Sequence, residues 1–362
     1  MTAVQMLCGL CMVLFAAELL TNAVEWLGLT LGLGEGAVGS VLAALGTALP
    51  ETAVPVTALV LRGGREAEQV GIGGILGAPF LLVTLGSLML ALSAVLLRTG
   101  RARREIAVSA DVFARDLVFF TIGFSLALVP AIWPARPVRL ATACALVGSY
   151  VAFVAMHVRA GRQAGSAAKL KPLYLQRGDG RPHLTSVLFQ LVAALALVVC
   201  GAHLLTKGVE VLSARVQLPA FLLSALIVPI ATELPETLNS VVWMREGKDG
   251  LAVGNVTGAM VFQGTLVPAI GVMFTDWTFS PAAWWAAALT LAAALLLMVA
   301  SRQAPHVQIW PLLLAASGYF AFPLVAFPAN ALSPPARLAL MLVLLGLAVQ
   351  SASMLVRRRA AR

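Results

Sequence analysis

Two segments far apart in the chain carry the same pattern of polar residues, and this pattern could bind a metal ion. Thr47 precedes Glu51 by four residues, and Thr232 precedes Glu236 by the same interval. Residues four apart share one face of an α-helix, so each pair would present a hydroxyl and a carboxylate together. Oxygen ligands of this kind suit a hard cation such as Ca²⁺ or Na⁺. We therefore expect Glu51 and Glu236 to be the primary metal ligands.

A proline stands directly before each of these glutamates, at Pro50 and Pro235. Proline has no N–H to donate, and its ring pushes away the carbonyl four residues earlier in a helix. We therefore predict a helix break at each position, which would free the carbonyl of Gly46 in the first segment and that of Ala231 in the second. Each break would offer one more oxygen to a cation and a place for gating movement.

The composition places these motifs in a membrane. Of the 362 residues 60% are hydrophobic and only 11% are charged, and the mean hydropathy is +0.92, which is too apolar for a water-soluble enzyme. Long stretches lack Asp, Glu, Lys and Arg, and a bilayer needs about 20 such residues per helix. The net charge of +9 does not indicate nucleic-acid binding, because the basic residues lie between the apolar runs.

The apolar runs predict an all-α integral membrane protein of about eleven spans. We expect helices at 4–29, 36–62, 69–97, 112–132, 138–158, 184–213, 219–244, 250–275, 281–301, 309–328 and 336–356. Five tryptophans near the predicted helix ends are expected to anchor the bilayer interface. They are Trp26, Trp133, Trp243, Trp277 and Trp310.

The basic residues predict the orientation. Basic residues favour the cytoplasmic side of a membrane. With the N-terminus outside and the C-terminus inside, 17 of them fall in cytoplasmic connections, and only 6 lie on the other side. Those six are Arg62, Arg65, Arg136, Arg139, Arg215 and Arg337. We expect a multi-pass protein of the cell membrane in this orientation.

The two halves of the chain share one design. Shifting the sequence by 185 residues aligns the first polar motif with the second, and Gly-rich segments follow both. Each half would hold five helices, an odd number, so the second half would enter the membrane from the opposite face. We predict a first repeat at 1–158, a cytoplasmic linker at 159–183, a second repeat at 184–328, and an extra C-terminal helix with a basic tail at 329–362.

The motifs GTALPET and ATELPET, each followed by a Gly-rich helix, resemble the α-repeats of the sodium/calcium exchanger family in the cation/Ca²⁺ antiporter superfamily. The resemblance implies ten core helices, alternating access, and a mid-membrane site made by the second and third helices of each repeat. Family ligands carry over at Thr47, Glu51, Thr232 and Glu236. The implied partners are inorganic cations and the lipid bilayer, with no organic cofactor.

The chain departs from the family pattern in the third helices, where serine and amide or acidic oxygens are usual. The first repeat has Ala78 and Leu82 at such positions, and the second has Ala259 for the serine and Gln263 at the acidic or amide position. Glu233 stands where serine is usual. We expect Glu233 and Gln263 to be supporting ligands of a lopsided site, so the family's ion stoichiometry does not carry over. A cation/H⁺ antiporter stays open beside a Na⁺-driven one.

Charged residues in the first helix of each half form a separate group. An isolated charge at the centre of a transmembrane helix costs about 3 kcal/mol, so such residues need partners or water. Glu25, Lys207 and Glu210 could couple the gating helices to the core, with Lys207 pairing with Glu210. Alternatively, Glu25 and Glu210 lie in water at the interface.

Glycines in the third helices recur at spacings of three and four residues, as at Gly73 and Gly77 and at Gly254 and Gly258. Such spacing lets helices approach closely. Close backbones could also supply carbonyl ligands, and the sequence does not separate these two roles.

The leading functional hypothesis is a secondary active antiporter that exchanges Ca²⁺ or a related cation for Na⁺ or H⁺. Two alternatives come from other classes. The lost third-helix ligands would suit a sensor or scaffold that keeps the fold without transport. A membrane-embedded hydrolase with paired carboxylates is less favoured, because no metal cluster or serine with a base is visible at membrane depth in the sequence. The sequence leaves the transported ion, the coupling ion and the oligomeric state undetermined.

Overall fold

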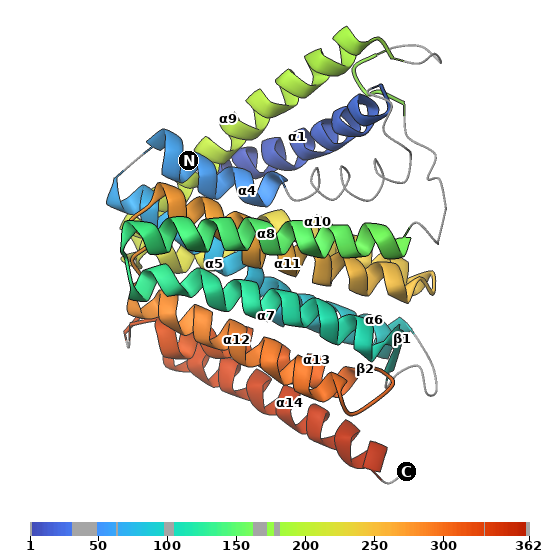
Figure 1. Cartoon of the computed structure of the whole chain (residues 1–362). Helices are drawn as coiled ribbons and strands as arrows, with labels where there is room; N and C mark the ends of the chain where they lie inside the picture. The colour runs from blue at the N-terminus through green and yellow to red at the C-terminus, as the bar shows by residue number, and fades with distance from the viewer. Residues whose placement is uncertain are drawn as a thin grey trace.

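The computed structural model describes residues 2–30, 49–62, 64–97, 105–161, 172–176, 182–328 and 330–359. Within these ranges the chain forms a bundle of long helices (Figure 1). Residues 172–176 of the linker, the strands β1 (Glu105–Ser109) and β2 (His306–Gln308), and the C-terminal end of α14 (Pro334–Arg359) lie at the same end of the bundle. We call this end the linker face and the other end the opposite face.

The described part of the first half contains six α-helices and two wider π-helical segments. The α-helices are α1 (Thr2–Thr30), α4 (Leu49–Val56), α5 (Arg65–Leu81), α6 (Ser87–Leu97), α7 (Ala110–Ile132) and α8 (Arg136–Gly161). The π-helix η2 (Thr57–Arg62) continues α4 soon after Pro55, and η3 (Leu82–Gly86) continues α5 soon after Pro79. Proline removes a helical hydrogen bond and displaces a carbonyl, and a wider turn accommodates both effects.

The second half contains six α-helices. They are α9 (Leu184–Val216), α10 (Ala220–Arg245), α11 (Asp249–Phe274), α12 (Pro281–Ser301), α13 (Ile309–Ala326) and α14 (Pro334–Arg359). In the described part of the chain, nine helices or helical runs are long and apolar enough to cross a bilayer. The predicted all-α membrane fold is confirmed, and the predicted helices match those observed within a few residues. Of the predicted helix 36–62, residues 36–48 lie outside the described residues.

A small antiparallel sheet was not expected from the sequence. Strand β1 (Glu105–Ser109) pairs with β2 (His306–Gln308), and this pairing joins the connections that precede α7 and α13 at the linker face. Asp249, at the start of α11, accepts a hydrogen bond from the backbone N–H of Ala107 at 2.9 Å. The sheet and this bond therefore tie the starts of α7, α11 and α13 together.

The prediction that Trp277 lies at the bilayer interface is wrong. Trp277 is fully buried, and its indole Nε1–H donates to the carbonyl of Ala127 at 2.8 Å. Its edge lies against Gly271 near the end of α11. Trp277 therefore fastens the connection between α11 and α12 to α7 and does not face lipid.

Helices α1 and α9 form a pair that runs obliquely to the rest of the bundle (Figure 1). Their backbones meet at Gly9 and Gly201, because a Cβ on either glycine would lie 2.8 Å from the carbonyl oxygen of the other. Small residues permit this close approach in a membrane, where van der Waals packing supplies much of the attraction between helices. The pair is therefore a tightly packed unit.

A short piece of the linker crosses this pair, and we call residues 172–176 the strap. Asn22 of α1 donates to the carbonyl of Pro172 at 3.3 Å and accepts from the N–H of Tyr174 at 3.2 Å. Gln190 of α9 donates to the Asn22 side chain at 2.9 Å and accepts from the N–H of Leu175 at 2.9 Å. The two side chains therefore hold the strap to both helices at once.

Replacing Asn22 by alanine should release the strap. The variant loses three hydrogen bonds, each of which contributes about 1 kcal/mol. We expect hydrogen–deuterium exchange at the amides of Tyr174 and Leu175 to accelerate about tenfold or more. Tyr174→Phe is the control, because it removes the bond from the Tyr174 hydroxyl to Glu18 at the exposed edge of the contact and leaves the Asn22 side chain unchanged. Equal exchange in wild type and Asn22→Ala would contradict this role for Asn22.

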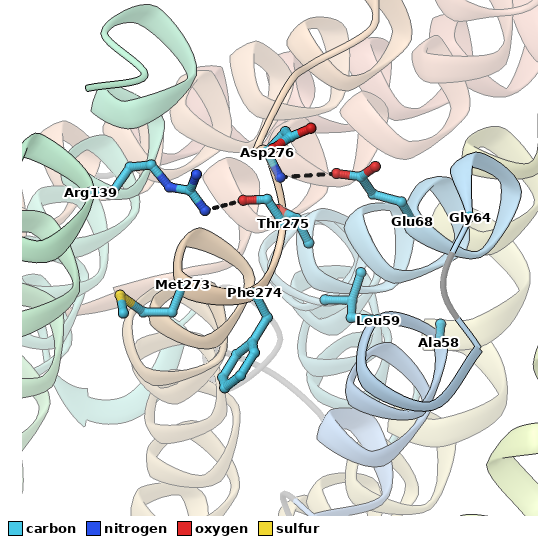
Figure 2. Close-up of a pocket in the computed structure, with 9 residues that line it drawn as sticks. All are labelled: Ala58, Leu59, Gly64, Glu68, Arg139, Met273, Phe274, Thr275 and Asp276. Carbon is cyan, nitrogen blue, oxygen red and sulfur yellow. Dashed lines mark hydrogen bonds between the residues drawn. The ribbon is translucent and has the colours of Figure 1, made fainter. Parts of the chain in front are cut away.

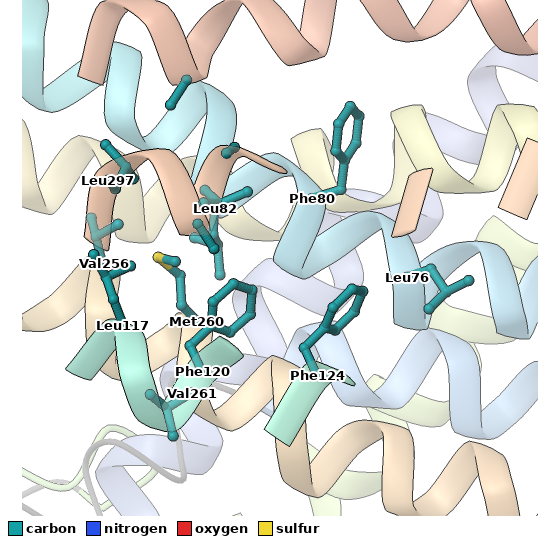
Figure 3. Close-up of a cluster of buried hydrophobic side chains, with 14 of the residues drawn as sticks. Leu76, Phe80, Leu82, Leu117, Phe120, Phe124, Val256, Met260, Val261 and Leu297 are labelled. Carbon is teal, nitrogen blue, oxygen red and sulfur yellow. The ribbon is translucent and has the colours of Figure 1, made fainter. Parts of the chain in front are cut away.

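The main hydrophobic core lies between α5, α7, α11 and α12. Phe120, Met260 and Leu297 pack around Leu82 at the start of η3 (Figure 3). Leu82 is only 1% exposed, so the position at which an amide ligand was expected contributes hydrocarbon to the core instead.

Helices α5 and α10 are in backbone contact beside this core. A Cβ on Gly73 would lie 2.7 Å from the Phe221 carbonyl oxygen, and one on Gly77 would lie 2.4 Å from that of Ala225. The hydroxyl of Ser224 donates to the carbonyl of Val70 at 2.6 Å. These first-half glycines therefore have a packing role. At Gly254 and Gly258 of α11 a Cβ would meet no described atom within 4 Å.

Candidate cation site

The residues predicted as ligands map mainly to α4, α10 and α11. The backbone of Glu51 lies in α4, and Thr232, Glu233 and Glu236 lie along α10. Helix α4 packs beside both α10 and α11. Gly46 and Thr47 lie outside the described residues. The fold therefore brings together the helices that carry the two predicted primary ligands.

Helix α10 remains helical through its proline. The helix runs without interruption from Ala220 to Arg245 and includes Ala231 and Pro235. Pro235 still lacks an N–H, so one helical hydrogen bond is missing within it. The predicted break at Pro235 is therefore a local loss of one donor and not a division of α10 into two helices. Pro50 likewise lies within the helical residues of α4.

The best-defined polar contact of the site joins Glu233 to Gln263. Glu233 is fully buried near the middle of α10, and Gln263 of α11 is 2% exposed. The Gln263 amide Nε2 donates to Glu233 Oε1 at 3.2 Å. Sequence analysis proposed both residues as ligands, but only the structure gives the bond that links them.

This bond uses the amide nitrogen of Gln263 and does not involve its amide oxygen. Gln263 Oε1 is buried and accepts no hydrogen bond from the described residues. A buried acceptor without a donor costs about 1 to 3 kcal/mol, so such an atom favours the arrival of a donor or a cation. An amide oxygen beside a carboxylate is a ligand pair that Ca²⁺ and Na⁺ accept.

Two threonine hydroxyls flank the carboxylate on α10. Thr232 donates to the carbonyl of Val228 at 3.0 Å, and Thr237 donates to that of Glu233 at 3.1 Å. Both residues are buried. A hydroxyl that gives its hydrogen to a carbonyl keeps lone pairs on its oxygen. The observed geometry of Thr232 is therefore compatible with binding a cation.

The first-half third helix contributes no comparable oxygen at the positions where ligands were expected. Ala78 is 3% exposed, and Leu82 belongs to the hydrophobic core. On α11, by contrast, Asn255 donates to Ser240 of α10 at 3.2 Å, two turns from Gln263 toward the linker face. Among the predicted ligands whose side chains the structure describes, Thr232 and Glu233 lie on α10 and Gln263 lies on α11.

The residues proposed for coupling lie on the oblique helix pair. The backbone of Glu25 lies in α1, and Lys207 and Glu210 lie in α9. Lys207 is exposed and forms no ion pair within the described part of the chain, whereas Glu210 is half-buried. The predicted pairing of Lys207 with Glu210 is therefore not present in this structure.

A separate pocket of about 340 Å³ opens at the opposite face (Figure 2). Ala58 and Leu59 of η2 line it, so the pocket adjoins the segment that continues α4. Glu68 of α5 accepts from the backbone N–H of Asp276 at 3.1 Å, and Arg139 donates to the carbonyl of Val272 at 2.9 Å and to that of Thr275. Carboxylates at a pocket rim raise the local cation concentration, which Arg139 partly opposes. Sequence analysis gave Glu68 and Asp276 no role.

Comparison with known proteins identifies the family. A family model described as sodium/calcium exchanger protein matches residues 1–159 and 186–327. The chain belongs to the sodium/calcium exchanger family. The resemblance inferred from the two motifs is confirmed. This family member is a multi-pass membrane protein, and its family is one of transporters.

Individual relatives are more distant. The inner membrane protein YrbG of Escherichia coli (strain K12) is 24% identical over 281 residues, which cover 76% of this chain and 81% of YrbG. The putative antiporter CaxA of Alkalimonas amylolytica is 23% identical over 280 residues, which cover 76% of this chain and 82% of CaxA.

Solved structures share the fold. The H⁺/Ca²⁺ exchanger CAX superposes with a TM-score of 0.66 at 17% identity, over 99% of this chain and 88% of CAX. Native YfkE gives a TM-score of 0.62 at 12% identity, over 90% of this chain and 91% of YfkE. At these identities the likeness establishes the fold, and the transported ions of this family member remain to be argued from its own residues.

Proposed function

We propose that the protein is a secondary active antiporter that exchanges Ca²⁺ or a related cation for Na⁺ or H⁺ by alternating access. The cation site consists of Glu51 and Glu236 as primary ligands, with Thr47, Thr232, Glu233 and Gln263 as supporting oxygens. The observation that carries the proposal is the buried Glu233–Gln263 contact at mid-helix, beside an amide oxygen that has no donor in the described residues. Membership of the exchanger family supports the same reading.

We further propose that the chain consists of two inverted repeats, at 1–158 and 184–328, separated by the linker and followed by an extra C-terminal helix. The family model matches two stretches with a gap between them, which supports this division. In the sequence, most of the basic residues fall in the connections expected on the side of the linker, so we assign the linker face to the cytoplasm and place the protein in the cell membrane with its N-terminus outside. The oblique α1–α9 pair would move against the rest of the bundle during transport.

One observation favours a second candidate, a membrane protein that binds cations without transporting them. Ala78 and Leu82 give the first half hydrocarbon where ligands were expected. A site with fewer oxygens would bind its ion mainly with ligands from one half of the chain. Movement of that half would then not carry the ion across the membrane.

Flux of radiolabelled Ca²⁺ into proteoliposomes separates these functions. We expect uptake when a Na⁺ or H⁺ gradient is imposed, and no uptake above that of protein-free liposomes without a gradient. Running the two gradients separately identifies the coupling ion. Ca²⁺ binding by isothermal titration without flux under either gradient would overturn the antiporter and establish the non-transporting candidate.

A further inference from the structure

A second buried polar cluster lies between α7, α8 and α11, away from the Glu233–Gln263 contact. Asp116 of α7 is 3% exposed, and its Oδ2 accepts from the hydroxyl of Thr257 of α11 at 2.8 Å. Its Oδ1 lies 3.4 Å from Nε2 of His157 of α8. Sequence analysis assigned none of these three residues a role.

The hydrogen-bond geometry of His157 implies an additional proton. The ring nitrogen Nδ1 lies 3.1 Å from the carbonyl oxygen of Phe153, which can only accept, so Nδ1 must carry a hydrogen. A neutral imidazole has one N–H, and the Nε2 lone pair would then lie close to Asp116 Oδ1, a buried oxygen that accepts no hydrogen bond from the described residues. Two lone pairs facing each other repel. One proton between Nε2 and Oδ1 turns this repulsion into attraction.

Among the described side chains, Arg115 is the further charged group beside Asp116. Arg115 of α7 places its Nε 3.8 Å from the same Oδ1, which favours an ionised Asp116 and opposes a positive charge on His157. On α11 the acidic residue Asp249 is bonded to Ala107 instead. Helix α12 carries no titratable residue. On the strands, Glu105 accepts from Gln308, and His306 is exposed.

Protein does not cover one side of this cluster. The His157 side chain is 38% exposed, whereas that of Asp116 is 4% exposed. His157 lies near the end of α8 that leads into the linker, so its exposed edge is at the linker face. A proton can therefore enter from that face by binding the Nε2 lone pair, and it returns to water by the same route.

We propose that Asp116 and His157 form a proton-binding site that is separate from the cation site, and that Thr257 connects this site to α11. The bound state is an imidazolium at His157 beside an ionised Asp116, and loss of the proton leaves neutral His157 with its lone pair facing the carboxylate. The site holds α8 to α7 through its proton and α7 to α11 through Thr257. Because α11 also carries Gln263 six residues further on, proton occupancy at the linker face biases the position of a cation ligand.

Nuclear magnetic resonance of the full chain in detergent tests the site without requiring transport. The chain has only four histidines, and the other three, His183, His203 and His306, are exposed. With ¹⁵N-labelled histidine, His157→Gln identifies the signal of His157. At about pH 7.5, where exposed imidazoles are neutral, we expect both nitrogens of His157 to be protonated. In Asp116→Asn the amide can donate to Nε2, so we expect a neutral ring with its hydrogen on Nδ1.

Two results would overturn the proposal. One is a wild-type His157 that carries a hydrogen on only one ring nitrogen at this pH. The other is an Asp116→Asn variant in which His157 keeps both protons. If Asp116→Asn does not fold, Asp116→Glu, which retains the carboxylate, must preserve the doubly protonated His157 signal, and its loss counts against the site.

The link to transport rests on the proposed function and has its own measurement. In proteoliposomes, varying the pH at the linker face should change the Ca²⁺ flux of wild type, and Thr257→Val should flatten this dependence while the His157 signal stays doubly protonated. An unchanged pH profile in Thr257→Val would refute the coupling to α11. Absence of flux in every variant would refute the antiporter and leave the result on the proton site standing.

Discussion

Glu51→Gln and Glu236→Gln will each reduce gradient-driven Ca²⁺ uptake by about 100-fold. Each change keeps the shape of the side chain but replaces a charged ligand with a neutral amide. Loss of one charged interaction in a buried site costs about 3 kcal/mol, which corresponds to about a hundredfold in affinity. The measurement is the initial rate of radiolabelled uptake in proteoliposomes at equal protein density.

The matched control is Glu66→Gln. Glu66 lies in the first turn of α5 and is exposed at the opposite face, so the same chemical change there should leave uptake near the wild-type rate. Full activity in both Glu51→Gln and Glu236→Gln would remove these carboxylates from the site. Loss of uptake in Glu66→Gln as well would show that the assay responds to surface charge.

Gly77→Ala should severely destabilise the protein. The added methyl would meet the backbone of Ala225 on α10, with its oxygen at 2.4 Å and its Cα at 2.7 Å. Backbone atoms cannot rotate away as a side chain can, so α5 and α10 must separate. Overpacking of this kind costs about 3 kcal/mol. We expect a lower apparent melting temperature in detergent, and loss of uptake because α10 carries Glu233 and Glu236.

Gly148→Ala provides the comparison for this prediction. Gly148 lies on the exposed side of α8, and a Cβ there would meet no described atom within 4 Å. Alanine is a better helix former than glycine by about 1 kcal/mol, so stability should stay level or rise slightly. If Gly77→Ala had the same apparent melting temperature as Gly148→Ala, α5 and α10 would not be in the close backbone contact described above.

The membrane helices could be predicted from sequence because lipid offers no partner for backbone polar groups. An apolar run of about 20 residues must satisfy its own N–H and C=O groups, and a helix does so within one segment. The predicted bounds of 281–301 agree with those of α12 for this reason. The small sheet β1–β2 escaped prediction because its two strands are short and pair across about two hundred residues.

The sequence contained an indication that Asp116 has a buried partner, and this indication was not used. It is an acidic residue within the predicted helix 112–132, and charges at such depth require partners. The partners, His157 and Thr257, lie on two other helices and have no fixed spacing to Asp116 in the sequence. Asn22 and Gln190 are similar, since nothing local distinguishes them from other polar residues that face a neighbouring helix.

The class of protein, the helices and the residue types available to bind a cation follow from the amino-acid sequence, because hydropathy and helical spacing are local properties. Three other features became evident only from the packing of the helices: the bond from Gln263 to Glu233, the place of Leu82 in the core, and the burial of Trp277. Each of these outcomes depends on which helix faces which, and contacts between distant segments set that arrangement. The strap across α1 and α9 and the proposed proton site beside α11 likewise depend on contacts between segments that are distant in the sequence.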